Sequence, residues 1–248
     1  MPFSMIDARG IPVLFYSYTA GGKTYEDDMG RDPEGMKKFY QLLAKEIPAT
    51  SQLNEYQYQE FFTELLQKGD VLHIAFGSGM TTSVQSAEAA ARKLRIQFPQ
   101  RKLFVIDSLC SSSGYGMLVD GAADLRDTGA TIEEVAAWTD RERHRIHHAF
   151  YSVDLKYFRL SGRMSGVAAT VGSILNICPI LRLDDKGKIV AYDKVRGKRN
   201  AVEYILNQMR IHAAGGENYN GKVFLCHSNV PEDARATKKA IEARFKRI

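Results

Sequence analysis

Apolar runs of strand length alternate with amphipathic stretches of helix length along most of the chain. The runs at 71–76 and 103–108 are compact, and each precedes a stretch with helical spacing of its apolar residues, at 83–94 and 113–127. This order of strand, helix, strand and helix is typical of a parallel sheet with helices on both faces. The pattern predicts an α/β fold whose ligands bind at the carboxyl ends of the strands.

The same kind of signal predicts elements on either side of this region. Asp32 and Pro33 are typical of a helix N-cap and first helical residue, and Gly21-Gly22 is typical of a hairpin turn. Further strands are predicted at 11–18, 149–153, 178–183, 188–195 and 222–227, with 49–52 as a polar connection. Further helices are predicted at 33–46, 54–68, 132–148, 166–175, 201–213 and 231–245.

A chain of 248 residues exceeds the usual size of one domain. We therefore expect two α/β domains, 1–148 and a smaller one at 149–248, with a cleft between them. Hydrophobic residues make up 44% and charged residues 25%, and no apolar run approaches the roughly 20 residues of a membrane span. The first residues lack the pattern of a secretion signal, so we expect a cytoplasmic protein without an integral membrane segment.

Charge and cysteines exclude several classes of protein. The formal net charge of +5 comes mostly from lysines and arginines interleaved with acids, which is typical of a solvated surface and disfavours nucleic-acid binding. Cys110, Cys178 and Cys226 lie far apart, which argues against a disulfide framework or a zinc site and predicts buried, apolar roles. His144, His147 and His148 have helical spacing but strongly basic neighbours, so a solvated face is favoured over a metal site.

The end of the run at 71–76 carries the first candidate site. There Gly77-Ser78-Gly79 interrupts the apolar residues, and Met80-Thr81-Thr82 leads into the next predicted helix. A helix start offers backbone N–H groups without partners and the positive end of the helix dipole, and hydroxyls at Ser78, Thr81 and Thr82 add donors. The segment is therefore a candidate site for a carboxylate or phosphate, with simple capping of the helix as the alternative.

Two residues of the second half are further candidates. Arg163 stands in Ser161-Gly162-Arg163-Met164-Ser165, where a guanidinium can bind a carboxylate or simply form an ion pair. His227 ends the strand predicted at 222–227, where it can donate to an anion or be satisfied by neighbouring backbone. No hydrolase elbow, phosphate-binding loop or dinucleotide fingerprint accompanies these residues.

Seven blocks in order resemble the DegV family of bacterial proteins, and in particular its fatty-acid-binding members of the FakB type. The blocks are Thr50-Ser51-Gln52, Phe76-Gly77-Ser78-Gly79-Met80 with Gln85-Ser86-Ala87, Val105-Ile106-Asp107-Ser108, Ser161-Gly162-Arg163-Met164-Ser165, Leu175-Asn176-Ile177-Cys178-Pro179-Ile180-Leu181, Lys194-Val195-Arg196-Gly197 and His227-Ser228-Asn229. The resemblance spans nearly the whole chain, although this sequence starts just after the place of the family's first strand.

The resemblance implies a two-domain protein that holds one long-chain fatty acid in an apolar tunnel and needs no other cofactor. Carried over by motif, the carboxylate contacts are Thr50, Ser78, Gly79, Thr81, Thr82, Arg163 and His227. The residues at 166–175 become candidates for the tunnel wall, with plain core as the alternative. Family members of this type present the carboxylate to a separate ATP-dependent fatty acid kinase, which makes an acyl phosphate for phospholipid synthesis.

The sequence and the resemblance together leave three hypotheses for the function of this protein. The first is a non-catalytic carrier that serves a fatty acid kinase. The second is a small-molecule hydrolase with Ser78 as nucleophile and His227 as base, and the third is a nucleic-acid-binding module suggested only by the net charge. The strands predicted at 178–183 and 188–195 are expected to form a hairpin closed by Asp184-Asp185-Lys186-Gly187. The basic segment 194–199 fits either docking of the kinase or solvation of this hairpin.

Overall fold

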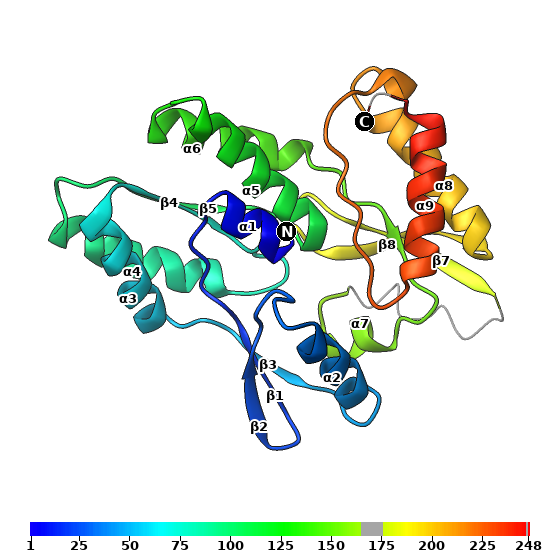
Figure 1. Ribbon diagram of the computed structural model, residues 1–248, viewed down its shortest axis with the longest axis horizontal. Helices are drawn as coiled ribbons and strands as arrows, with labels where there is room; N and C mark the ends of the chain where they lie inside the picture. The colour runs from blue at the N-terminus through cyan, green and yellow to red at the C-terminus, as the bar shows by residue number, and fades with distance from the viewer. Residues whose placement is uncertain (165–175, 247) are drawn as a thin grey trace. The chain divides into compact units, whose positions relative to one another are not determined.

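The structure, a computed structural model, describes residues 1–164, 176–246 and 248, and its contacts divide the chain into two compact units (Figure 1). Unit 1 comprises Met1–Ser108 and Leu118–Arg141, and unit 2 comprises Leu109–Met117 and Glu142–Ile248. The domains predicted at 1–148 and 149–248 stay a prediction, because contact-defined units say nothing of independent folding. The helix predicted at 166–175 lies outside the described residues.

Unit 1 is built around a parallel pair of strands, β4 (Val71–Ala75) and β5 (Leu103–Asp107). Between them along the chain comes α4 (Ser83–Gln97), so the predicted strand–helix–strand order is confirmed. Helices α3 (Glu55–Lys68) and α4 lie on one side of the pair, and α5 (Ser112–Asp127) and α6 (Ile132–Glu142) lie on the other (Figure 1). The fold is mixed α/β, as the sequence predicts.

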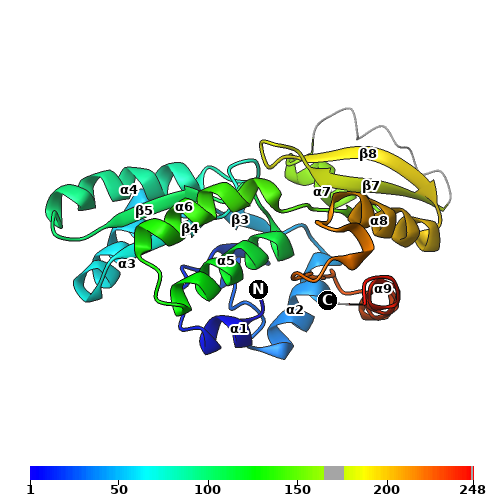
Figure 2. The same cartoon turned by 90° about the horizontal axis from the view of Figure 1, so that it is seen from above.

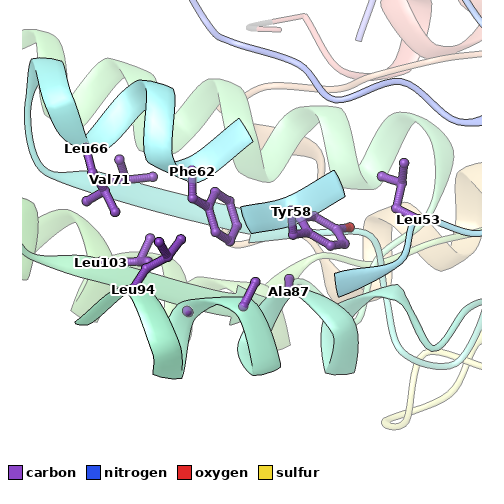
Figure 3. Close-up of a cluster of buried hydrophobic side chains, with 10 residues drawn as sticks. Leu53, Tyr58, Phe62, Leu66, Val71, Ala87, Leu94 and Leu103 are labelled. Carbon is purple, nitrogen blue, oxygen red and sulfur yellow. The ribbon is translucent and has the colours of Figure 1, made fainter. Parts of the chain in front are cut away.

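The core of unit 1 fills the space between α3, α4 and the parallel pair (Figure 3). Its members are large on α3 and small on α4: Leu53, Tyr58, Phe62, Leu66, Val71, Ala87, Ala90, Ala91, Leu94 and Leu103. Alanines on α4 let its backbone approach the aromatic rings of α3, which fill the space. Asn54 caps α3 by accepting from the Gln57 N–H, while the Gln57 side chain accepts from the Asn54 N–H.

A second sheet of unit 1 is antiparallel, in the order β2–β1–β3. Its strands are β1 (Ser17–Ala20), β2 (Lys23–Glu26) and β3 (Ala49–Ser51), and the predicted Gly21-Gly22 hairpin turn is confirmed. Helix α1 (Phe3–Ala8) precedes the sheet, and α2 (Pro33–Leu43) begins with the predicted Asp32 cap and Pro33.

Two predictions for this sheet are wrong in detail. The strand predicted at 11–18 is regular only from Ser17. Leu14 and Tyr16 before it pack against the core, and the Tyr16 carbonyl accepts from the Asp27 N–H at 2.9 Å just beyond the regular pairing. Conversely, 49–52 is more than a connection, since β3 pairs with β1 and places Thr50 opposite Tyr18. Short polar stretches give no periodic signal of a strand.

Unit 2 contains an antiparallel sheet in the order β6–β7–β8, together with helices (Figure 2). Its elements are β6 (Phe150–Tyr151), α7 (Lys156–Ser161), β7 (Ile177–Leu183), β8 (Ile189–Arg196), α8 (Lys198–His212), α9 (Pro231–Arg244) and 3₁₀ turns at Arg143–Arg145 and Gly216–Asn218. The predicted β7–β8 hairpin is confirmed, and Gly187 closes its turn with φ +71°.

Two further predicted elements differ from the structure. The helix predicted at 132–148 ends at Glu142, and a 3₁₀ turn follows. No strand forms at 222–227, because this segment packs against a helix cluster rather than beside another strand. In that cluster Val223 contacts a core made of Leu206, Ile241 and Phe245 from α8 and the end of α9. Val223 therefore packs without a ladder, whereas Leu225 and Cys226 of the same segment are exposed.

Close packing of α5 on α6 yields a stability prediction. A Cβ atom on Gly121 would lie 2.4 Å from the Cη2 atom of the Trp138 ring, which is shorter than any normal contact. Gly121→Ala is therefore expected to lower the free energy of unfolding by about 1–3 kcal/mol, although alanine favours helices. Urea unfolding measures this loss.

The matched control is Gly69→Ala, because apart from its two chain neighbours no described residue has an atom within 4 Å of a Cβ at Gly69. Equal stability of the two variants would show that the ring of Trp138 moves aside without cost.

Candidate functional site

The segment 77–82, called here the hydroxyl loop, joins the carboxyl end of β4 to the start of α4. It is a turn, because the Met80 N–H donates to the Gly77 carbonyl at 2.9 Å. Gly77 and Met80 are buried, whereas Ser78 and Thr82 are exposed. Hydroxyls therefore face solvent from a loop anchored by buried residues, as the sequence predicts for a ligand site.

Neighbouring elements hold the hydroxyl loop at both ends. The Ser78 N–H donates to Oδ1 of Asp107, the last residue of β5, at 3.0 Å. At the other end the Thr82 hydroxyl donates to Oε1 of Gln52 at 2.6 Å. Gln52 directly follows β3, so this bond connects the strand of Thr50 to the hydroxyl loop.

The hydroxyls of the loop are not equivalent donors. The single proton of Thr82 goes to Gln52, so Thr82 has none left for a ligand. Thr81 accepts from the Ser83 N–H at 3.2 Å, and its hydroxyl lies 3.0 Å from the hydroxyl of Ser83, which is fully buried. If Ser83 donates in this pair, Thr81 keeps its own proton for a ligand.

The start of α4 favours an anion. Thr82 makes no capping hydrogen bond, and the first turn of this 15-residue helix carries no acidic side chain. Partly unsatisfied N–H groups and the positive end of the helix dipole therefore lie beside the hydroxyls of Thr81 and Ser78. Such an arrangement can bind a carboxylate or a phosphate by hydrogen bonds.

Sequence reasoning missed the roles of Gln52 and Asp107. Asp107 ends a parallel strand next to β4, in register with Ala75, so its carboxylate belongs to the same sheet edge as Ser78. That adjacency was a usable signal, because carboxyl ends of parallel strands lie together. For Gln52 the signal was its place in the block Thr50-Ser51-Gln52, since β3 pairs in a different sheet.

The remaining predicted site residues lie at different places. Thr50 is an exposed residue of β3, and Gly79 is half-buried in the hydroxyl loop. Arg163 and His227 belong to unit 2. Arg163 follows Gly162, which ends α7 with φ +69°, and its guanidinium donates to the Ser161 carbonyl.

His227 differs from its prediction in burial. It was expected at the end of a buried strand, whereas it is exposed in irregular chain, and Cys226 beside it is exposed too. The prediction of buried cysteines holds for Cys110 and Cys178. Nδ1 of His227 accepts from the Val230 N–H at 3.2 Å, so the neutral ring carries its proton on Nε2.

His144 and His147 are exposed, whereas His148 is not. His148 is half-buried, against the prediction of a solvated face, because Nε2 of its ring lies 3.3 Å from both the N–H and the carbonyl of Ser111. Burial lowers the pKa of His148. Among residues 1–164, 176–246 and 248, no three His, Cys, Asp or Glu side chains gather as metal ligands, and no histidine hydrogen-bonds to Ser78.

Within the part of the chain that the structure describes, none of the helices combines the length and hydropathy that spanning a bilayer requires.

Comparison with known proteins places the chain in a family. The family described as "Uncharacterised protein, DegV family COG1307" matches residues 1–248. A DegV domain-containing protein of Clostridium perfringens is 28% identical over 247 residues, which cover 99% of this chain and 84% of that protein.

Two solved structures extend the comparison. One, titled as fatty acid binding of a DegV family protein from Thermus thermophilus, is 30% identical with a TM-score of 0.74, and the match covers 87% of this chain and 75% of that one. The Streptococcus pneumoniae Fatty Acid Kinase B3 protein, loaded with linoleic acid, shares the fold at 19% identity and a TM-score of 0.75 over 94% and 80% of the two chains. By the match along its whole length, the chain belongs to the DegV family.

Proposed function

We propose that this protein binds one long-chain fatty acid and holds the carboxylate at the hydroxyl loop and the start of α4. The observation that carries the proposal is the hydroxyl loop itself. Exposed Ser78 and half-buried Thr81 lie beside a helix start without acidic residues. A carboxylate that leaves water needs such donors, because an unpaired charge is costly to desolvate.

Thr81 is the donor that we favour within the loop. Buried Ser83 has its hydroxyl 3.0 Å from that of Thr81. When Ser83 donates to Thr81 and Thr81 donates to the carboxylate, the three groups form a chain of hydrogen bonds in which each bond strengthens the next.

Relatives support the choice of ligand. The Thermus thermophilus protein is titled as fatty acid binding, and the Streptococcus pneumoniae protein was loaded with linoleic acid. Each buried methylene of an acyl chain contributes about 0.8 kcal/mol, so a bound fatty acid survives purification when its chain is enclosed.

The name of the Streptococcus pneumoniae relative, a Fatty Acid Kinase B3 protein, supports a partner as well. We propose that this chain does no catalysis alone and presents its fatty acid to a kinase. The kinase transfers the γ-phosphoryl group of ATP to a carboxylate oxygen, releases ADP and leaves an acyl phosphate for phospholipid synthesis. The need for ATP places this exchange in the cytoplasm.

Organic extraction and mass spectrometry of the purified protein test the proposal. About one fatty acid for each chain is the expected result. A folded protein that carries no lipid and takes none up from added fatty acid would overturn it.

A second measurement tests the donor. Thr81→Val is expected to weaken binding of hexadecanoic acid about tenfold and to leave binding of hexadecan-1-ol unchanged, because only the acid places a charged acceptor at the loop. Titration calorimetry measures both. Arg163→Ala and His227→Ala, the predicted contacts in unit 2, are measured in the same way.

The matched control is Thr24→Val, which changes an exposed threonine of β2. Equal losses for acid and alcohol in Thr81→Val would point to damaged packing instead of a lost donor.

A further inference from the structure

The hydroxyl loop depends on two side chains outside it. Oε1 of Gln52 accepts from the Thr82 hydroxyl at 2.6 Å across 30 residues of chain, and Oδ1 of Asp107 accepts from the Ser78 N–H at 3.0 Å across 29 residues. These bonds lie at opposite ends of the loop and come from different sheets. Together with buried Met80 they fix the loop at three points.

The position of the loop matters because a hydroxyl can donate to the carboxylate only from within hydrogen-bond distance. A loop that must be ordered at the moment of binding costs side-chain and backbone entropy, which a loop already held in shape does not. Thr81 stands between the two tethers, and its backbone has no partner strand to position it. Its placement therefore depends on what holds Ser78 and Thr82.

We propose that Gln52 and Asp107 are positioning residues, which hold the hydroxyl loop in the shape that binds a carboxylate without touching the ligand. This inference rests on the proposed function. It also assigns Thr82 a structural role, because its proton belongs to Gln52. Thr82 then affects binding of the carboxylate only by holding Thr81 and the start of α4 in position.

The bond between Gln52 and Thr82 is tested with the full chain and two probes, hexadecanoic acid and hexadecan-1-ol. Gln52→Met and Thr82→Val remove opposite halves of the same bond. Each is expected to weaken binding of the acid about tenfold, the double variant no further, and all three are expected to bind the alcohol as the wild type does.

Opposite outcomes overturn this half of the inference. If Thr82 donated to the ligand, Gln52→Met would release its proton and bind the acid as tightly as the wild type or more tightly, while Thr82→Val alone would lose affinity. Additive losses in the double variant would mean two independent roles.

Two substitutions of Asp107 test its role as a hydrogen-bond acceptor and its charge separately. Asp107→Ala removes the acceptor for the Ser78 N–H and is expected to weaken binding of the acid about tenfold. Asp107→Asn keeps a carbonyl oxygen in place of Oδ1 and is expected to restore wild-type binding. Equal loss in the Asn and Ala variants would overturn the positioning role, because then the charge and not the bond would matter.

Wild-type binding is measured first, so that failure of the proposed function can be told apart from failure of the positioning roles. A wild type that binds neither probe, or binds acid and alcohol alike, overturns the proposed function and this inference with it. A wild type that prefers the acid, with variants that keep that preference at full affinity, overturns only the positioning roles. Thermal melting of each variant shows that the fold is intact.

Discussion

Between neutral pH and about pH 4 the free energy of unfolding is expected to fall by about 3 kcal/mol through His73 alone. His73 lies in the middle of β4, and its ring contacts the edges or faces of the Tyr58 and Phe62 rings, with centroids 5.3 and 5.2 Å away. Its Nε2 atom is buried and has no hydrogen-bond partner among the residues that the structure describes. Burial lowers the pKa of His73 from 6.5 to about 4.

The sign follows from proton uptake. In the unfolded chain the imidazole takes up a proton as the pH falls through 6.5, whereas in the folded protein it stays neutral until about pH 4. The unfolded state therefore binds more protons in this window, and acid stabilises it relative to the fold. The stability present above pH 6.5 is lost progressively as the pH falls, and is fully lost below about 4.

Urea unfolding over this pH range measures the effect in the wild type and in His73→Phe, which keeps a ring between Tyr58 and Phe62. The variant is expected to lose less stability in acid than the wild type, by the contribution of His73. His144→Gln, at an exposed position, is the matched control and should keep the full dependence. Parallel curves for the wild type and His73→Phe would contradict the assignment.

His73 also illustrates what the sequence leaves open. In Val71-Leu72-His73-Ile74-Ala75 a polar residue interrupts an apolar run, yet the run still predicts β4 correctly. The pattern does not reveal which face of a strand meets which helix. Contact with Tyr58 and Phe62 comes from packing of α3, some 10 to 15 residues earlier in the chain, and that packing sets the pKa.

Predictions succeeded where one local rule determines the structure. Asp32 and Pro33 start α2, and turns at Gly21-Gly22 and Gly187 join paired strands. Each depends on a few neighbouring residues and on backbone geometry. Failures at 11–16 and 222–227 have the opposite cause, because an apolar segment packs on a core with or without a ladder beside it.

The candidate site shows the same division. Ser78, Thr81 and Thr82 were predicted because a helix start follows a strand, which is local information. Their unequal roles were not, because the choice depends on Gln52 and on Ser83. A hydroxyl becomes a donor for ligand only when no nearer acceptor takes its proton, and acceptors arrive by tertiary folding.

The other large effect concerns Arg9, which follows α1 and reaches three carboxylates on one face of α5. Its guanidinium lies 2.9 Å from Asp120, 2.6 Å from Asp124 and 3.2 Å from Asp127. Asp120 is only 2% exposed, so Arg9 lies against a carboxylate with little access to water. Arg9→Met is expected to lower the melting temperature by about 10 °C, because a buried carboxylate would lose its cation.

A second substitution separates the effect of the lost charge from the effect of the lost packing. Arg9→Met combined with Asp120→Leu removes both charges and is expected to recover most of the lost melting temperature, since an apolar pair leaves nothing unpaired. Arg235→Met is the matched control, because Arg235 pairs with Glu232 on an exposed face of α9. A melting temperature of Arg9→Met equal to that of the control would mean that Asp120 finds another partner, and that the contact of α1 with α5 does not depend on this cation.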